Sequence, residues 1–126
     1  MLTLTYESLS ADERASLCNG CGGKATIDVP DFHSTETCNR HDLAYWIGGT
    51  EDDRAVADYR LWDDMRRDAR AALPRWWQVF QRQALYAVAW TYYQAVRREA
   101  ASHFHFGTPR GRAELDARMA SRRKVG

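Results

Sequence analysis

Two adjacent glycines, Gly48 and Gly49, constrain the fold of this chain more than any other feature. A run with helical spacing precedes them, and glycine very commonly ends a helix. Thr50 and Asp53 follow with the spacing of a helix N-cap and its first-turn acid. Two helices joined by so short a turn are expected to pack antiparallel against each other.

The remainder of the chain is also patterned for helices, so we predict an all-α fold in a single domain over residues 1–126. Hydrophobic residues make up 44% of the chain and charged residues 28%, which is typical of a globular composition. The expected helices cover about residues 11–17 with a Ser10–Glu13 capping box, 34–47, 51–71 and 74–101, and a last helix begins at Thr108–Pro109.

An aromatic-rich stretch from Trp76 to Val96 carries apolar residues around most of its helical circumference. Such a helix is usually buried in the centre of a small domain, so we expect most of its aromatic side chains in the core. The alternative is that they lie at a lipid interface. Arg82 and several glutamines interrupt the stretch, which argues against a membrane-spanning helix.

Four chemically active side chains crowd the helix that ends at the glycine pair. Positions three and four apart share one face of a helix. On the next helix, Asp58 falls within an apolar stripe that should face inward, made of Ala55, Tyr59, Trp62, Met65, Ala69 and Ala72. The side chains that the spacing gathers on the first helix are Cys38, His41, Asp42 and Tyr45.

Asp58 needs partners, because burying an ionised carboxylate without them is costly. Antiparallel packing makes His41 and Tyr45 the expected partners. A carboxylate that accepts from an imidazole N–H fixes its tautomer and raises its basicity, which leaves the other ring nitrogen to take a proton from water. Asp42 points about 100° around the helix from His41, toward the upstream glycine loop. A carboxylate beside such a loop suits a hard cation such as calcium.

These motifs resemble those of secreted phospholipase A2 and its bacterial and viral relatives. The matching pieces are "CGG" in a glycine loop, "CNRHDLAY" with the family's Cys-x-x-His-Asp-x-x-x-Tyr run, and "ADYRLW" with an aspartate on the next helix. The resemblance spans about Asn19 to Met65. It implies a small all-α phospholipase A2-like domain, with a site region over about 18–65 and a helical C-terminal part over about 74–126.

The resemblance also implies a reaction: calcium-dependent hydrolysis of the sn-2 acyl ester of glycerophospholipids. The substrate would be a phospholipid membrane surface or lipid aggregate. His41 would act as the general base that activates water, Asp58 would orient His41, and Tyr45 would donate a hydrogen bond into the same network.

Calcium is the cofactor that the resemblance implies. It would stabilise the oxyanion of the tetrahedral intermediate and hold the phosphate. Asp42 would supply the carboxylate ligand, and Cys21 and Cys38 match the cysteines that join the calcium loop to the catalytic helix. The remaining ligands would be backbone carbonyls near Gly20, Gly22 and Lys24.

Zinc is the strongest alternative. Cys18-x2-Cys21 followed by Cys38-x2-His41 has the spacing of a structural zinc site, which would make the protein a binding or interaction module. A further alternative is a phospholipase-like fold that has lost catalysis, because a fold does not guarantee an activity.

The overall charge favours no nucleic-acid partner, because a net charge of +1 provides no electrostatic footprint. We expect the basic clusters Arg66-Arg67, Arg97-Arg98 and Arg122–Lys124 to be solvated faces. His103 and His105 alternate with phenylalanines and are expected to face solvent rather than a metal. The first ten residues lack the basic and apolar regions of a secretory signal peptide. That leaves an internal protein, export by another route and an already mature chain all open.

Overall fold

The computed structural model of the protein describes residues 4–18 and 35–125. Within these ranges it is helical, as predicted, and its only β feature is an isolated bridge between Gly49 and Phe106. None of the described helices combines the length and hydropathy needed to cross a lipid bilayer. The elements in chain order are η1 (Tyr6–Ser8), α1 (Ala11–Leu17), α2 (Thr35–Ile47), α3 (Glu51–Ala72), η2 (Trp76–Gln78), α4 (Val79–Glu99), η3 (Ala101–His103) and α5 (Arg112–Val125).

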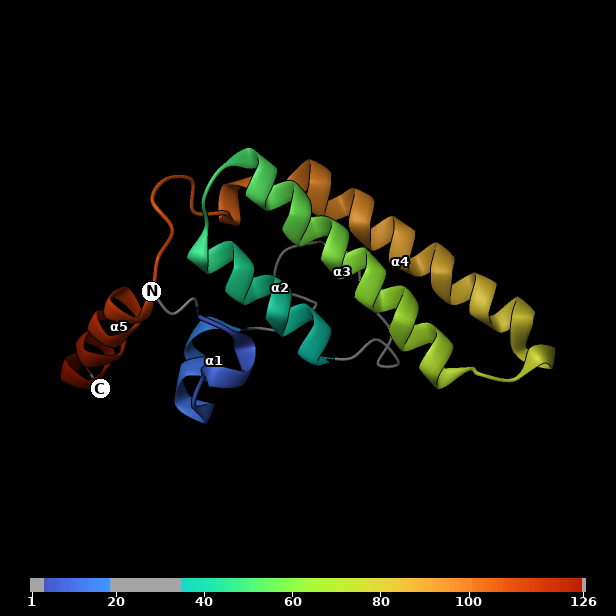
Figure 1. Cartoon of the computed structure of the whole chain (residues 1–126), viewed down its shortest axis with the longest axis horizontal. Helices are drawn as coiled ribbons and strands as arrows, with labels where there is room; N and C mark the ends of the chain where they lie inside the picture. Colours follow the sequence, from blue (N-terminus) through green and yellow to red (C-terminus); the bar gives the residue numbers. More distant parts are fainter. Residues whose placement is uncertain (1–3, 19–34, 126) are drawn as a thin grey trace.

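Three helices form the main body of the described structure. Figure 1 shows α3 lying between α2 and α4, with α3 and α4 forming a long hairpin and α2 running beside the first part of α3. The helix α1 lies next to α2, and α5 lies near α1 at the opposite end from the hairpin turn. Arg112 Nη1 of α5 forms an ion pair with Glu13 Oε2 of α1 at 2.6 Å, which ties the last helix to the first.

The predicted helix starts of α1 and α3 are present. Ser10 and Glu13 form the expected capping box at α1, and Thr50 and Asp53 form another at α3. Each box satisfies backbone N–H groups that the first helical turn leaves without an intrahelical partner. These local signals therefore place α3, and with it Asp58, at a defined register relative to the turn.

The glycine turn between α2 and α3 is held by the segment that follows α4. Gly48 and Gly49 have φ values of 80° and 137°, a region that L side chains rarely adopt. The Gly49 N–H donates to His105 O at 2.9 Å, and the His105 N–H donates to Tyr45 O at 3.1 Å. Gly107 donates in turn to Gly49 O at 3.1 Å. The C-terminal end of α2 is thus fixed from two sides.

The core has two parts. One lies among α2, α3 and α4 and ends on Phe104, whose ring meets the ring of Tyr45 edge-on at 5.1 Å. The second lies where the N-terminal segment, α2 and α5 meet. Its buried members are Leu4, Leu9, Leu43 and Leu115.

The prediction that the aromatic helix is central to the core is wrong for much of it. The buried residues of α4 are Ala89, Tyr92 and Val96, which form one stripe. Within the described structure α4 packs chiefly on α3, so only that stripe is covered. The predicted start was also too early, since Trp76–Gln78 forms a separate 3-10 turn before α4. The large side chains left exposed are Trp76, Trp77, Val79, Phe80 and Trp90.

Two further expectations need correction. The last helix begins at Arg112 rather than at Thr108–Pro109, because the Arg110 N–H donates to Ile47 O at 2.8 Å and draws this segment to α2. The side chain of Glu114 then accepts from the Gly111 N–H at 2.7 Å, which caps the helix.

On α3, the predicted inward stripe is partly shifted. Met65 and Ala69 are buried as expected, but Tyr59 is exposed, as is Ala72 at the helix end. Asp58 is buried as predicted, and Arg54 and Leu61 are buried in addition. The stripe turned inward therefore includes an arginine, which hydrophobic patterning does not reveal.

Candidate active site

The crowded face of α2 is buried. Cys38, His41 and Tyr45 lie on one side of the helix at three- and four-residue spacing, and all are buried. The rings of His41 and Tyr45 lie against each other, with centroids 4.3 Å apart. Tyr45 also packs on Phe104, so the imidazole rests on a fixed aromatic neighbour.

Asp58 of α3 is the centre of the site. Its side chain is 0% exposed. Its Oδ1 atom lies 2.7 Å from His41 Nε2 and accepts a hydrogen bond from the Tyr45 hydroxyl at 2.6 Å. The contacts that antiparallel packing predicts for Asp58 are therefore present.

The second carboxylate oxygen of Asp58 is held by arginines. Arg97 Nη1, from the end of α4, donates to Asp58 Oδ2 at 2.7 Å, and Arg54 Nη1 lies 3.5 Å from the same atom. Glu51 bridges the two guanidinium groups, with its Oε1 2.9 Å from Arg54 Nη2 and 2.8 Å from Arg97 Nη2. A fully buried carboxylate thus has donors on both oxygens, which compensates its loss of solvation.

The sequence patterns predicted neither arginine as part of the site. Arg97 was expected on a solvated face, and this is wrong, because its guanidinium reaches the buried Asp58. Arg54 stands four residues before Asp58, so the two share a face of α3, and this spacing is the signal that could have found it. No local pattern links Arg97 to Asp58, which lies 39 residues away.

The charges around Asp58 decide the protonation of the site. Burial opposes ionisation of Asp58, but hydrogen bonds from His41, Tyr45 and Arg97 outweigh it and hold the pKa of Asp58 below its ordinary value. Burial, together with the hydrogen bond to Asp58, raises the pKa of Tyr45, so its phenol stays protonated and donates. An ionised Asp58 favours the imidazole tautomer with hydrogen on Nε2, which leaves the basic lone pair of His41 on Nδ1.

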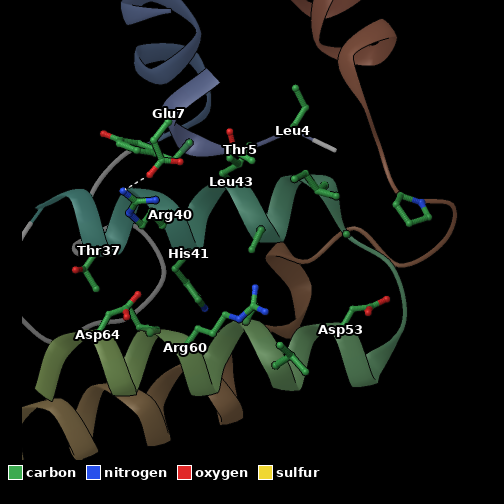
Figure 2. A pocket seen from close by; sticks show the side chains of 18 residues that line it. Leu4, Thr5, Glu7, Thr37, Arg40, His41, Leu43, Asp53, Arg60 and Asp64 are labelled. Atoms are coloured by element: carbon green, nitrogen blue, oxygen red, sulfur yellow. Dashed lines mark ion pairs between the residues drawn. The ribbon is translucent and has the colours of Figure 1, made fainter. Parts of the chain in front are cut away.

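His41 also forms part of the wall of a pocket of about 820 Å³ between the N-terminal segment, α2 and α3. Figure 2 shows His41 projecting from α2 toward α3, with Arg60 reaching from α3 into the same space. The arrangement places a histidine of fixed tautomer on the wall of a largely apolar cavity. The apolar side chains of the wall include Leu4, Leu43, Ala44, Ile47, Val56, Ala57 and Leu61.

The predicted metal ligands lie mainly outside the described residues. Asp42 is described and is 4% exposed, directly beside His41 in the chain. Within residues 4–18 and 35–125, no group of three or more His, Cys, Asp or Glu side chains could hold a metal ion. The predicted ligands and disulfide partner outside these ranges are Gly20, Gly22, Lys24 and Cys21.

One of the four ligands of the zinc hypothesis, Cys21, also lies outside the described residues. Of the other three, Cys18 Sγ lies 3.4 Å from Asn39 O, and His41 Nε2 is occupied by Asp58. Tetrahedral zinc coordination through His41 would therefore have to use Nδ1.

The remaining histidines of the described structure stand apart from this site. His103 is exposed, and His105 Nε2 lies 3.0 Å from Thr108 O. Phe104 between them is buried, so the alternation predicted for this segment is present in part. His33 lies outside the described residues.

Comparison of the chain with protein-family models, with curated proteins and with solved structures gives no match.

Proposed function

We propose that the protein is a phospholipase A2-like esterase that hydrolyses the sn-2 acyl ester of glycerophospholipids with the help of calcium. The observation that carries the proposal is the 2.7 Å contact between His41 Nε2 and the fully buried Asp58. A carboxylate–imidazole pair of this kind is suited to general-base catalysis, because it fixes the tautomer and stabilises the imidazolium that forms.

The proposed chemistry uses His41 twice. Its Nδ1 atom takes a proton from water as the water oxygen attacks the ester carbonyl carbon. The tetrahedral intermediate then expels the glycerol oxygen, and the imidazolium returns the proton to that oxygen. The products are a fatty acid and a lysophospholipid. Asp58 stays ionised throughout and stabilises the imidazolium, while Tyr45 and Arg97 hold the Asp58 carboxylate in place.

The pocket supports a lipid substrate. Its wall is lined largely by aliphatic side chains, including Leu43, Ile47 and Leu61, which suit a fatty acyl chain. Arg60 contributes a guanidinium to the same pocket, and a guanidinium binds phosphate well. The aliphatic wall would therefore accommodate an acyl chain of a phospholipid, and Arg60 would bind its phosphate.

Asp42 supports the choice of calcium. Its carboxylate is buried and directly follows the proposed base, and carboxylate oxygen is the ligand type that a hard cation prefers. Calcium held by Asp42 and by carbonyl groups near Gly20, Gly22 and Lys24 would supply electrostatic stabilisation of the oxyanion. We propose that Cys38 forms a disulfide with Cys21, which would join the loop to α2.

The experiment that tests the proposal compares paired variants in a fatty-acid release assay on phospholipid vesicles. His41→Gln and Asp42→Asn should each abolish calcium-dependent release. His103→Gln and Asp116→Asn change the same residue types at exposed positions and should keep full activity. Full hydrolysis by the His41→Gln protein would disprove the mechanism.

Elemental analysis with a free-thiol count separates the enzyme from the zinc module. A disulfide, no zinc and stabilisation by added calcium are expected for the enzyme, since a ligand that binds only the native state stabilises it. One zinc per chain without a disulfide would instead establish the binding module.

A further inference from the structure

The turn of the α3–α4 hairpin carries three exposed aromatic side chains. Trp76 is 81% exposed, Trp77 59% and Phe80 84%, and we call these three residues the aromatic tip. Figure 1 shows that this turn lies at the far end of the molecule from α5. Large aromatic groups left in water in this way commonly mark an interaction surface.

Hydrogen bonds hold the turn that carries the aromatic tip in one conformation. Arg82 Nη1 donates to Leu73 O at 2.6 Å and to Arg75 O at 2.9 Å, which closes the turn from the α4 side. The Arg75 N–H also donates to the Gln78 side chain at 2.9 Å. The indole rings of the tip meet edge-on with centroids 5.8 Å apart. The fold therefore holds the aromatic side chains out in a defined conformation.

The charge of the residues around the aromatic tip indicates which kind of partner this surface binds. No acidic residue occurs between Asp68 and Glu99, so the hairpin turn and the first turns of α4 carry only positive charge. Tryptophan and arginine together favour the boundary between lipid headgroups and acyl chains, and positive charge favours anionic lipids. The charged residues in this interval are Arg70, Arg75, Arg82, Arg97 and Arg98.

A groove beside the tip adds a place for an anion. It has a volume of about 500 Å³ and lies between Trp62 and Arg66 of α3 and Trp90 of α4. Arg66 lies over the Trp62 ring at 4.1 Å, and its Nε atom is buried with no acceptor among the described residues. Arg70 lines the same groove. A phosphate oxygen would satisfy the unpartnered donor.

The groove and the tip are continuous along α4. Phe80, Gln83, Ala87 and Trp90 follow one another at three- and four-residue spacing, so they share one side of the helix. The last three of them line the groove. We propose that this side of the α3–α4 hairpin docks on an anionic phospholipid bilayer, with the aromatic tip entering the interface and Arg66 and Arg70 binding lipid phosphate.

The test uses the full chain and vesicles of phosphatidylcholine with or without phosphatidylglycerol, sedimented in the presence of a calcium chelator. The chelator prevents calcium-dependent hydrolysis, so binding is measured independently of the proposed function. The wild-type chain should sediment with the phosphatidylglycerol vesicles, and its tryptophan emission should shift to shorter wavelength. The Trp76→Ser/Phe80→Ser double variant should bind at least roughly tenfold more weakly.

Phe106→Ser is the matched control, because Phe106 is an exposed aromatic residue at 51% that lies outside the hairpin. It should bind as the wild type does. Arg66→Gln/Arg70→Gln should lose the preference for phosphatidylglycerol and keep residual binding through the tip. Equal binding by the wild type and the tip variant would overturn the proposal. A wild-type dimer that ignores vesicles and becomes monomeric in the tip variant would also overturn it, because the tip would then contact a second copy of the chain.

Discussion

Replacing Asp58 with asparagine is the perturbation that reports most on the proposed site. The substitution keeps the shape of the side chain and removes its charge. Asp58 accepts at 2.6–2.7 Å from His41, Tyr45 and Arg97, so both of its oxygens are in use. An asparagine has one acceptor oxygen and one donor NH2 group, and it cannot serve both sides.

Each orientation of the new amide disrupts a different part of the site. If the NH2 group faces Arg97, two donors meet and the guanidinium loses its carboxylate. If the NH2 group faces His41, Nε2 must become the acceptor and the ring must carry its hydrogen on Nδ1. That nitrogen then has no lone pair to accept a proton from water, so the general base is lost.

The structure sets the expected size of both effects. Loss of a general base lowers the rate by roughly 100- to 10,000-fold, and the fall should appear in kcat more than in KM. Breaking a buried charge pair costs about 3–5 kcal/mol. Arg97 is 26% exposed and regains some solvation, so we expect a loss near the lower end, about 3 kcal/mol.

The assay pairs initial rates of fatty-acid release with urea unfolding of the same samples. Asp52→Asn changes an exposed aspartate at the start of α3 and should alter the free energy of unfolding by no more than about 0.5 kcal/mol. A stability loss in Asp58→Asn with an unchanged rate would make Asp58 purely structural. If the Asp58→Asn protein had the stability and the rate of the wild type, the whole network would be refuted.

Three other substitutions probe separate parts of the structure. Tyr45→Phe removes one hydrogen bond to Asp58 while keeping the buried ring, so unfolding free energy should fall by about 1 kcal/mol in urea titrations, with a lower hydrolysis rate. Arg97→Gln should move acid unfolding to higher pH. The folded-state pKa of Asp58 is lowered, so its stabilisation is present above the ordinary aspartate pKa and is lost as pH falls through the folded value. Circular dichroism across acid pH, with exposed Arg98→Gln as control, measures this shift, and identical curves would contradict it. Gly48→Ala should destabilise by about 2 kcal/mol or more, because φ is 80° there and the new methyl group would meet a backbone carbonyl. A melting temperature equal to that of the wild type would refute this.

The part of the site that sequence reasoning reached is the part that local rules determine. Glycines and a capping box fixed the turn after α2, helical spacing then selected the side chains that face α3, and Asp58 was the buried carboxylate opposite them. His41 and Tyr45 contact it as expected. These contacts span only 17 and 13 residues, so little beyond one hairpin had to be known.

The contributions of α4 could not be obtained in the same way. Arg97 reaches Asp58 only because of where α4 docks along α3, and that register depends on packing across the whole hairpin. The apolar circumference of α4 indicated burial, yet Trp76 and Phe80 are exposed. The apolar content of a helix indicates that its surface avoids water. It does not indicate whether other helices or a lipid interface cover that surface.

The most direct test of the central claim is hydrolysis of phospholipid vesicles labelled separately at the sn-1 and the sn-2 acyl chain. The proposed chemistry predicts release of the sn-2 label alone, only when calcium is present, and loss of that release in His41→Gln. Release of neither label by the folded wild-type protein in calcium would contradict the proposal, as would sn-2 release that persists in His41→Gln.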